Sequence, residues 1–168
     1  MLRITKAEEQ AVRLAMRLAH VGTQLTLAEL ASREALPEPT VAKLLGMLRR
    51  AGVVAAARGR LGGYMLADAP QRISTAQVIR AVGSEPAHQH ACLSDPTTMA
   101  GCPRIGDCGL RSVWRHLHDQ VTNLLERTSL ADLLELEASV DEHVQNVWPI
   151  PLTVPVAASR AQGVVRDD

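Results

Sequence analysis

Two short apolar runs flank the glycine-rich segment RGRLGG within residues 53–70. Apolar runs of strand length that are separated by a few glycine-containing residues are typical of a β-hairpin, because glycine adopts the backbone conformations that tight turns require. The pattern therefore predicts a hairpin whose tip lies at residues 58–63. The segments before and after this hairpin carry helical patterns, so the fold must combine a small hairpin with helices.

The first two segments of the chain carry helical signals. Residues 5–21 are amphipathic, and Gly22 provides a stop. Residues 26–35 begin with Thr26 as an N-cap, and Glu29 three residues later completes a capping box. The stripe expected on one face of the first helix consists of Ala7, Ala11, Leu14, Ala15 and Leu18.

A third helix is predicted over residues 39–51 and a short fourth helix over 74–83. Pro39 fits the first turn, where its missing N–H costs nothing, and Gly52 provides the C-terminal stop. Helix, helix–turn–helix and hairpin is the order of a winged helix-turn-helix, so residues 1–83 are expected to form a DNA-binding domain. The buried side of the third helix is expected to consist of Val41, Leu44, Leu45 and Leu48.

Aromatic residues are scarce, with two Trp, one Tyr and no Phe in 168 residues. The core is therefore expected to consist of Leu, Val, Ile, Ala and Met, and Ala and Leu favour helices. The N-terminal segment carries charges throughout and lacks the apolar region of a signal peptide, and no run of 18 apolar residues predicts a membrane span. We expect a cytoplasmic protein that does not engage a membrane.

A long amphipathic helix is predicted over residues 108–127, and a further helix over 129–144 that opens with Ser129 and Asp132. A long helix attached to a small domain has little of its own chain to cover it, so residues 108–146 are expected to mediate homodimerisation. The alternative is that residues 129–144 fold back over the apolar stripe. That stripe consists of Leu110, Val113, Trp114, Leu117, Val121, Leu124 and Leu125.

All three cysteines lie in or directly after a Pro- and Gly-rich segment, residues 84–107, and the segment is too long for an idle connection. Thiolates of Cys92, Cys102 and Cys108 could share a metal centre, because sulfur ligands suit Zn, Cu(I) or iron–sulfur clusters. The closely spaced cysteine pairs of zinc sites are missing, although HQHAC offers two histidines. A disulfide switch between Cys102 and Cys108 is a further alternative.

Basic residues concentrate toward the front of the chain. Residues 1–68 hold ten Lys/Arg against six Asp/Glu, whereas residues 84–168 hold six against twelve. The asymmetry indicates an anionic partner for the front half, with ordinary solvated surface as the alternative. The second helix of a helix-turn-helix enters the major groove, and arginine at a hairpin tip can reach a narrow minor groove. The residues expected at DNA are Thr40, Lys43, Arg49, Arg50, Arg58, Gly59 and Arg60.

The segment LRRAGVVAAARGRLGGYMLA (48–67) resembles the recognition-helix end and wing of the Rrf-two family of bacterial transcription regulators, which includes IscR- and NsrR-like proteins. CGLRSVWRHLHDQVTNLLERTSLADLL (108–134) resembles the dimerisation helix of that family. The resemblance covers residues 1–140. It implies a mainly α fold with a small β-hairpin wing, namely a winged helix-turn-helix plus a long dimerisation helix. It also implies a homodimer on a palindromic double-stranded operator, with Arg58 entering the minor groove.

The resemblance further implies an iron–sulfur cluster, 2Fe-2S or 4Fe-4S, on Cys92, Cys102 and Cys108. The first cysteine spacing is longer than in the best-known members, and the second agrees. Some members use a histidine as fourth ligand where this chain has Arg111, which cannot ligate. Others use an acidic residue of the partner subunit, and alignment places Glu9 there. The alternatives are that Glu9 is an ordinary first-turn carboxylate and that His88, His90, a bound water or a thiol completes the site. Residues 84–107 would then form the cluster loop of a sensor of iron–sulfur, redox or nitric oxide status.

One departure concerns the operator. Ala42 stands where some members carry a base-reading glutamate, and Ala cannot accept a hydrogen bond from cytosine. The remaining alternatives are a regulator of the same fold that works by thiol oxidation or partner binding without a cluster, and a zinc-binding protein. No nucleophile–base arrangement indicates an enzyme. Residues 147–168, Pro-, Ala- and Val-rich without period, are expected to be disordered.

Overall fold

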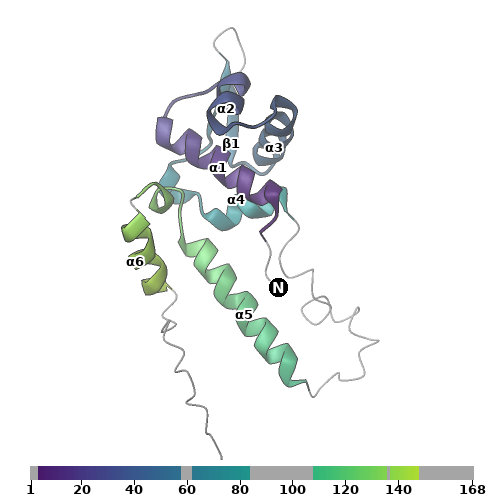
Figure 1. Ribbon diagram of the computed structural model, residues 1–168, viewed down its shortest axis with the longest axis vertical. Helices are drawn as coiled ribbons and strands as arrows, with labels where there is room; N and C mark the ends of the chain where they lie inside the picture. Colours follow the sequence, from purple (N-terminus) through teal and green to yellow (C-terminus); the bar gives the residue numbers. More distant parts are fainter. Residues whose placement is uncertain (1–3, 58–61, 84–107, 136, 148–168) are drawn as a thin grey trace, which may run out of the picture.

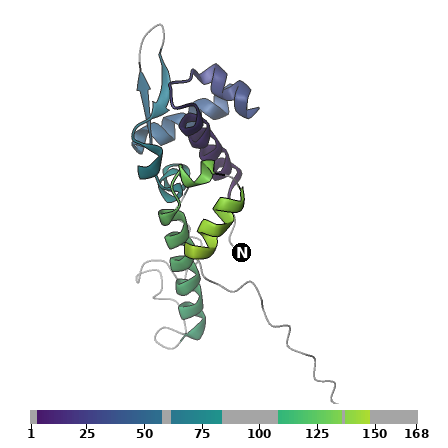
Figure 2. The same ribbon diagram turned by 90° about the vertical axis from the view of Figure 1, so that its left-hand side faces the viewer.

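The computed structural model describes residues 4–57, 62–83, 108–135 and 137–147. Four helices and a hairpin form one body, and a long helix projects from it with a last helix beside it (Figures 1 and 2). This arrangement confirms the expected mainly α fold with a small β-hairpin. The elements are α1 (Lys6–Val21), α2 (Leu27–Glu34), α3 (Glu38–Arg50), β1 (Val54–Ala57), β2 (Gly63–Leu66), η1 (Pro70–Arg72), α4 (Thr75–Val82), α5 (Gly109–Arg127), η4 (Asp132–Leu134) and α6 (Glu137–Val147).

Local signals set the helix ends as predicted. The Thr26 hydroxyl accepts a hydrogen bond from the Glu29 N–H at 3.2 Å, and the Glu29 carboxylate accepts one from the Thr26 N–H at 2.8 Å. These two bonds form the predicted capping box and satisfy N–H groups at the start of α2 that have no partner within the helix. Gly22, at the end of α1, and Gly52, just after α3, adopt positive φ values of 68° and 74°. This left-handed conformation is common where helices end.

The core is aliphatic, as the composition predicts. The predicted inner face of α3 is buried, with each of its four side chains at most 3% exposed. The corresponding stripe of α1 is buried with one exception, because Ala7 in the first turn is exposed. The buried side chains that unite α1–α4 with the hairpin include Leu14, Leu18, Leu30, Leu45, Leu48, Val53, Val54, Ile73 and Val78.

The hairpin is attached to the start of α2. Leu25 and Tyr64 exchange two backbone hydrogen bonds, of 2.9 Å and 2.8 Å. Gly63 lies so close to Leu25 that a Cβ on Gly63 would sit 2.7 Å from the Leu25 carbonyl oxygen. The paired residues of the two strands are Val54 with Leu66, Ala55 with Met65, Ala56 with Tyr64 and Ala57 with Gly63.

The end of α5 is joined to the start of α4 by main-chain bonds. The Thr75 N–H donates to the Thr128 carbonyl at 2.8 Å, and the Leu130 N–H donates to the Ile73 carbonyl at 2.9 Å. The Thr75 hydroxyl donates to the same Thr128 carbonyl at 2.9 Å, and Leu130 is fully buried. Residues 128–130 therefore form the joint between α5 and the rest of the fold.

The helix predicted over residues 129–144 is present only from Glu137 onward, and this joint explains its late start. Ser129 and Asp132 do form the expected cap, but only the short turn η4 follows it, and α6 begins at Glu137. Burying Leu130 and pairing its N–H with Ile73 holds this stretch away from helical geometry. Tertiary contacts outweigh a local helix signal here.

Asp132 is partly buried, and burial opposes its ionisation. Hydrogen bonds from the hydroxyl and the N–H of Ser129, together with the nearby His143, outweigh that effect and lower the pKa of Asp132 below its ordinary value. The stabilisation from this carboxylate is therefore present above the unfolded-state pKa and is lost as the pH falls through the lower folded-state pKa. None of the described helices is long and apolar enough to cross a bilayer.

We expect Gly63→Ala to lower the free energy of unfolding by about 1–3 kcal/mol, the usual cost of overpacking. The added Cβ would meet the backbone of Leu25, which cannot move without disturbing the hairpin pairing. Urea titration followed by circular dichroism measures the change. Gly109→Ala is the control, because nothing lies within 4 Å of its Cβ position. Equal stability of the two variants would contradict the close approach.

Candidate nucleic-acid interface and metal-binding segment

One face of α3 is available to a partner. Lys43, Arg49 and Arg50 are exposed and Thr40 is half-buried, while the opposite face is packed in the core. Ala42 is also exposed, so a methyl group occupies a position from which a longer side chain could contact a base. Arg49 and Arg50 lie in the last turn, where a positive charge also suits the helix dipole. This face combines positive charge with rigid support.

The hairpin stands next to α3 (Figure 1), and β1 begins four residues after Arg50, the last residue of α3. Its last pair is Ala57 with Gly63. The predicted DNA-binding residues Arg58, Gly59 and Arg60 come directly after Ala57 and lie outside the described residues. The structure thus brings Thr40, Lys43, Arg49 and Arg50 onto one helix and connects that helix to the hairpin through Val53.

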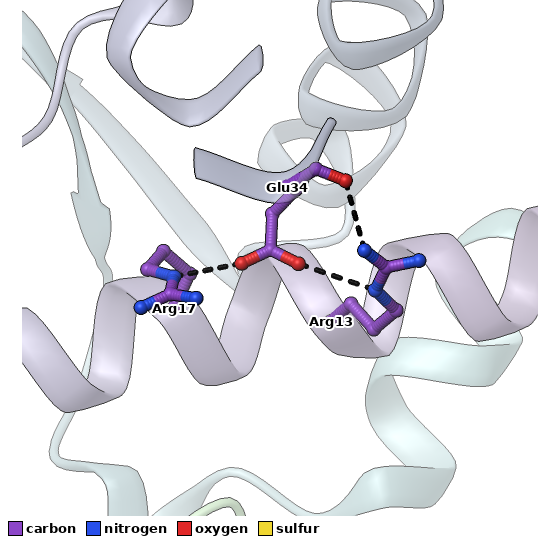
Figure 3. A network of polar contacts seen from close by, with 3 residues as sticks. All are labelled: Arg13, Arg17 and Glu34. Carbon is purple, nitrogen blue, oxygen red and sulfur yellow. Dashed lines mark hydrogen bonds and ion pairs between the residues drawn. The ribbon is translucent and has the colours of Figure 1, made fainter. Parts of the chain in front are cut away.

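A partly buried polar network centred on Glu34 fixes α2 to α1, and sequence analysis did not identify it. Glu34 accepts hydrogen bonds from the Arg13 Nε at 3.2 Å and from the Arg17 Nε at 2.7 Å (Figure 3). Arg13 also donates through Nη2 to the Glu34 carbonyl at 2.8 Å. The i,i+4 spacing of the two arginines places both on one face of α1. Spacing alone could not reveal a partner on another helix.

Of the three predicted cluster ligands, only Cys108 belongs to the described residues. It is a half-buried free thiol at the N-cap of α5, and its side chain makes no capping hydrogen bond. Cys92 and Cys102 lie outside the described residues. The one part of the donor set that can be tested, an unengaged thiol at a helix N-terminus, fits a metal-bound sulfur.

The adjacent carboxylates Glu8 and Glu9 have different surroundings. Glu8 is buried, and its carboxylate accepts a hydrogen bond from the Thr5 N–H at 2.6 Å as part of the α1 capping box. Glu9 is exposed in the first turn of α1. Arg111, at the position of a histidine ligand in some members, is half-buried on α5. Of the two carboxylates, Glu9 is therefore the one left accessible to a ligand from outside.

The apolar stripe of α5 is covered only in part. Val121 is buried and Leu124 and Leu125 are half-buried toward the body of the fold. In the projecting half, Leu110 is 55%, Val113 60% and Leu117 39% exposed. Although α6 lies beside α5, these three side chains remain open, so the described part of the chain does not cover this end of the stripe.

Comparison with known proteins gives a consistent result. The model of the Rrf2 family, described as an iron-dependent transcriptional regulator, matches residues 4–136. The chain is 33% identical over 136 residues to the transcriptional repressor NsrR of Streptomyces coelicolor, covering 79% of this chain and 88% of NsrR.

Solved structures agree with this match. T. potens IscR superposes with a TM-score of 0.61 at 27% identity, covering 79% of this chain and 86% of IscR. CymR, the global cysteine regulator of B. subtilis, superposes with a TM-score of 0.63 at 26% identity, covering 79% and 96% of the two chains.

We expect Lys43→Ala to weaken binding to a cognate DNA duplex by roughly 5- to 100-fold, the range for losing one good groove contact. If Lys43 neutralises a phosphate instead, the slope of log affinity against log salt falls by about 1. Fluorescence anisotropy at several salt concentrations measures both quantities. Arg80→Ala removes the same charge from α4, where Arg80 pairs with Glu126, and is the control. Equal effects of the two variants would place the interface elsewhere.

Proposed function

The chain belongs to the Rrf2 (Rrf-two) family of DNA-binding transcription regulators, and from this premise we propose that it is a homodimeric sensor whose operator binding depends on an iron–sulfur cluster. Like its family and relatives, it is a regulator and not an enzyme. The observation that carries the proposal is the free thiol of Cys108 at the start of a projecting helix that is itself joined to the DNA-binding body. Such a regulator would act on the chromosome in the cytoplasm.

The DNA interface is proposed on α3 and the hairpin. Thr40 and Lys43 would face the major groove from the first half of α3, and Arg49 and Arg50 would contact the phosphate backbone of the DNA. Arg58 would enter the minor groove, with Gly59 and Arg60 completing the wing. The exposure of Lys43, Arg49 and Arg50 above a fully packed inner face supports this assignment, because a rigid helix can hold them in register with base edges.

The dimer is proposed through α5. The exposed end of its stripe is apolar over about two turns, and exposing such a patch in water is unfavourable. A second copy of α5 would cover it and would place two α3 helices on the two halves of a palindromic operator. This geometry needs α5 to be fixed relative to α3, and the main-chain joint at residues 128–130 meets that need.

The cluster is proposed on Cys92, Cys102 and Cys108, with residues 84–107 as its loop and Glu9 of the partner subunit as fourth ligand. An iron–sulfur cluster binds thiolates tightly and so ties its protein ligands together. Cys108 would connect α5 to this centre, and Glu9 would connect α1 of the other subunit. Loss of the cluster then changes operator affinity only if the dimer with the cluster and the dimer without it bind DNA differently.

We expect anaerobically purified protein to be brown and to contain iron and acid-labile sulfide. Cys102→Ser should remove both while leaving the helical circular dichroism unchanged. Glu9→Gln should keep the cysteines and shorten the lifetime of the cluster in air, because one ligand is lost. A colourless wild-type protein without iron and sulfide would instead support the cluster-free regulator, and stoichiometric zinc would support the zinc-binding alternative.

We expect Val113→Asp to raise the dimer dissociation constant by roughly 100-fold, because a carboxylate would be buried without a partner. Analytical ultracentrifugation measures this constant. Ser112→Asp places the same charge on an exposed position of α5 outside the apolar stripe and should leave the dimer intact. If Val113→Asp is as dimeric as the wild type, the subunits meet on another surface.

A further inference from the structure

We propose that Glu34 is a positioning residue for DNA binding: with Arg13 and Arg17 it holds the end of α2 so that α3 is presented at a fixed angle. The inference rests on the proposed role of α3 as the DNA-reading helix. Glu34 has no place in the DNA interface itself, and it acts through the helix that follows it.

The network is built to hold one geometry. The Glu34 residue is 7% exposed, whereas the arginine side chains are 43% and 35% exposed. Its two carboxylate oxygens are used by different arginines, and the second bond from Arg13 reaches the main chain of Glu34. A carboxylate with one oxygen on each side and an anchored backbone cannot turn without losing a bond (Figure 3).

The link from Glu34 to α3 is short. Only residues 35–37 separate the two helices, and Ala35 adopts φ 53° and ψ 44°, in the left-handed region. This region is unfavourable for a residue with a Cβ, so the surrounding structure must enforce this turn. Arg13 bonds the carbonyl directly before Ala35, and Pro37 restricts the last residue of the turn. The direction of α3 is therefore set close to the network.

The other end of α2 is attached to the wing. The Leu25–Tyr64 bridge precedes α2, and the Thr26–Glu29 capping box fixes its first turn. Helix α2 is thus held at its start by the hairpin and at its end by α1. Binding to a groove requires α3 and the wing to engage DNA together, and the angle between them depends on both attachments.

In Glu34→Gln, the loss of charge and the loss of the positioning role are expected to change DNA affinity in opposite directions. Glu34→Gln removes a negative charge, so it should slightly strengthen the general attraction of the protein for DNA phosphates. Weaker operator binding by this variant cannot then be a charge effect. A loss of stability alone would lower the amount of folded protein and would leave the affinity of the folded fraction unchanged.

We expect Glu34→Gln to weaken binding to a duplex selected by the wild type from a random library by roughly 2- to 30-fold per folded protein, the range for residues that act on a site through intervening structure. Affinity for a scrambled duplex of equal length should be unchanged or higher. Anisotropy titration measures both, and circular dichroism at the same temperature gives the folded fraction. Glu126→Gln makes the same charge change in the exposed Arg80–Glu126 pair and should bind like the wild type.

Arg13→Ala and the double variant Arg13→Ala/Glu34→Gln complete a cycle, and their effects on operator affinity should be less than additive because the residues act as a unit. Glu34→Gln binding the selected duplex as tightly as the wild type would overturn the positioning role, even if its melting temperature falls. If Lys43→Ala has no effect while Glu34→Gln does, the assignment of α3 fails instead, so the two proposals can be refuted separately.

Discussion

The backbone hydrogen bonds between residues 73–75 and residues 128–130 determine how the two functional parts of this protein are related. They join the start of α4, inside the body formed by α1–α4 and the hairpin, to the end of the projecting helix α5. They add to the packing of α5 against α4 and to the Arg80–Glu126 ion pair. With them, any subunit that packs on α5 acquires a defined orientation relative to α3. Because main-chain groups make these bonds, a side-chain replacement that keeps the N–H of Thr75 and Leu130 leaves both bonds available.

The same joint explains why the exposed end of α5 is informative. Its C-terminal half packs against α4, while the half near Cys108 projects from the body (Figure 2). The apolar side chains of that half, such as Val113, are therefore left uncovered by the part of the chain that the structure describes. In our proposal the α5 helix of a partner subunit covers them, and Cys108 then lies at the end of this helix pair.

Features determined within a few residues were predictable from the sequence. The Thr26–Glu29 capping box, the glycine stops and the inner face of α3 follow from local geometry and hydrophobic period, and they are confirmed. Features that require knowledge of distant neighbours were not. The Ser129–Asp132 cap was identified correctly, yet the helix expected after it is interrupted because Leu130 is held by Ile73. In the Glu34 network, Glu34 is separated from Arg17 by 17 positions and from Arg13 by 21 positions, and no local pattern indicates such distant pairs. Most of the predicted metal and wing residues belong to segments that the structure does not describe, so their roles remain proposals.

The scarcity of aromatic residues has a practical consequence for spectroscopy. Tyr64 is the one tyrosine of the chain, and it lies in β2 with its backbone bonded to Leu25. Biosynthetic labelling with fluorotyrosine would therefore give a single fluorine resonance, and that resonance would originate in the wing. Trp114, one of two tryptophans, lies half-buried on α5 and would provide a separate fluorine signal from the projecting helix. Labelled in these two ways, the chain would carry separate reporters on its hairpin and on its projecting helix.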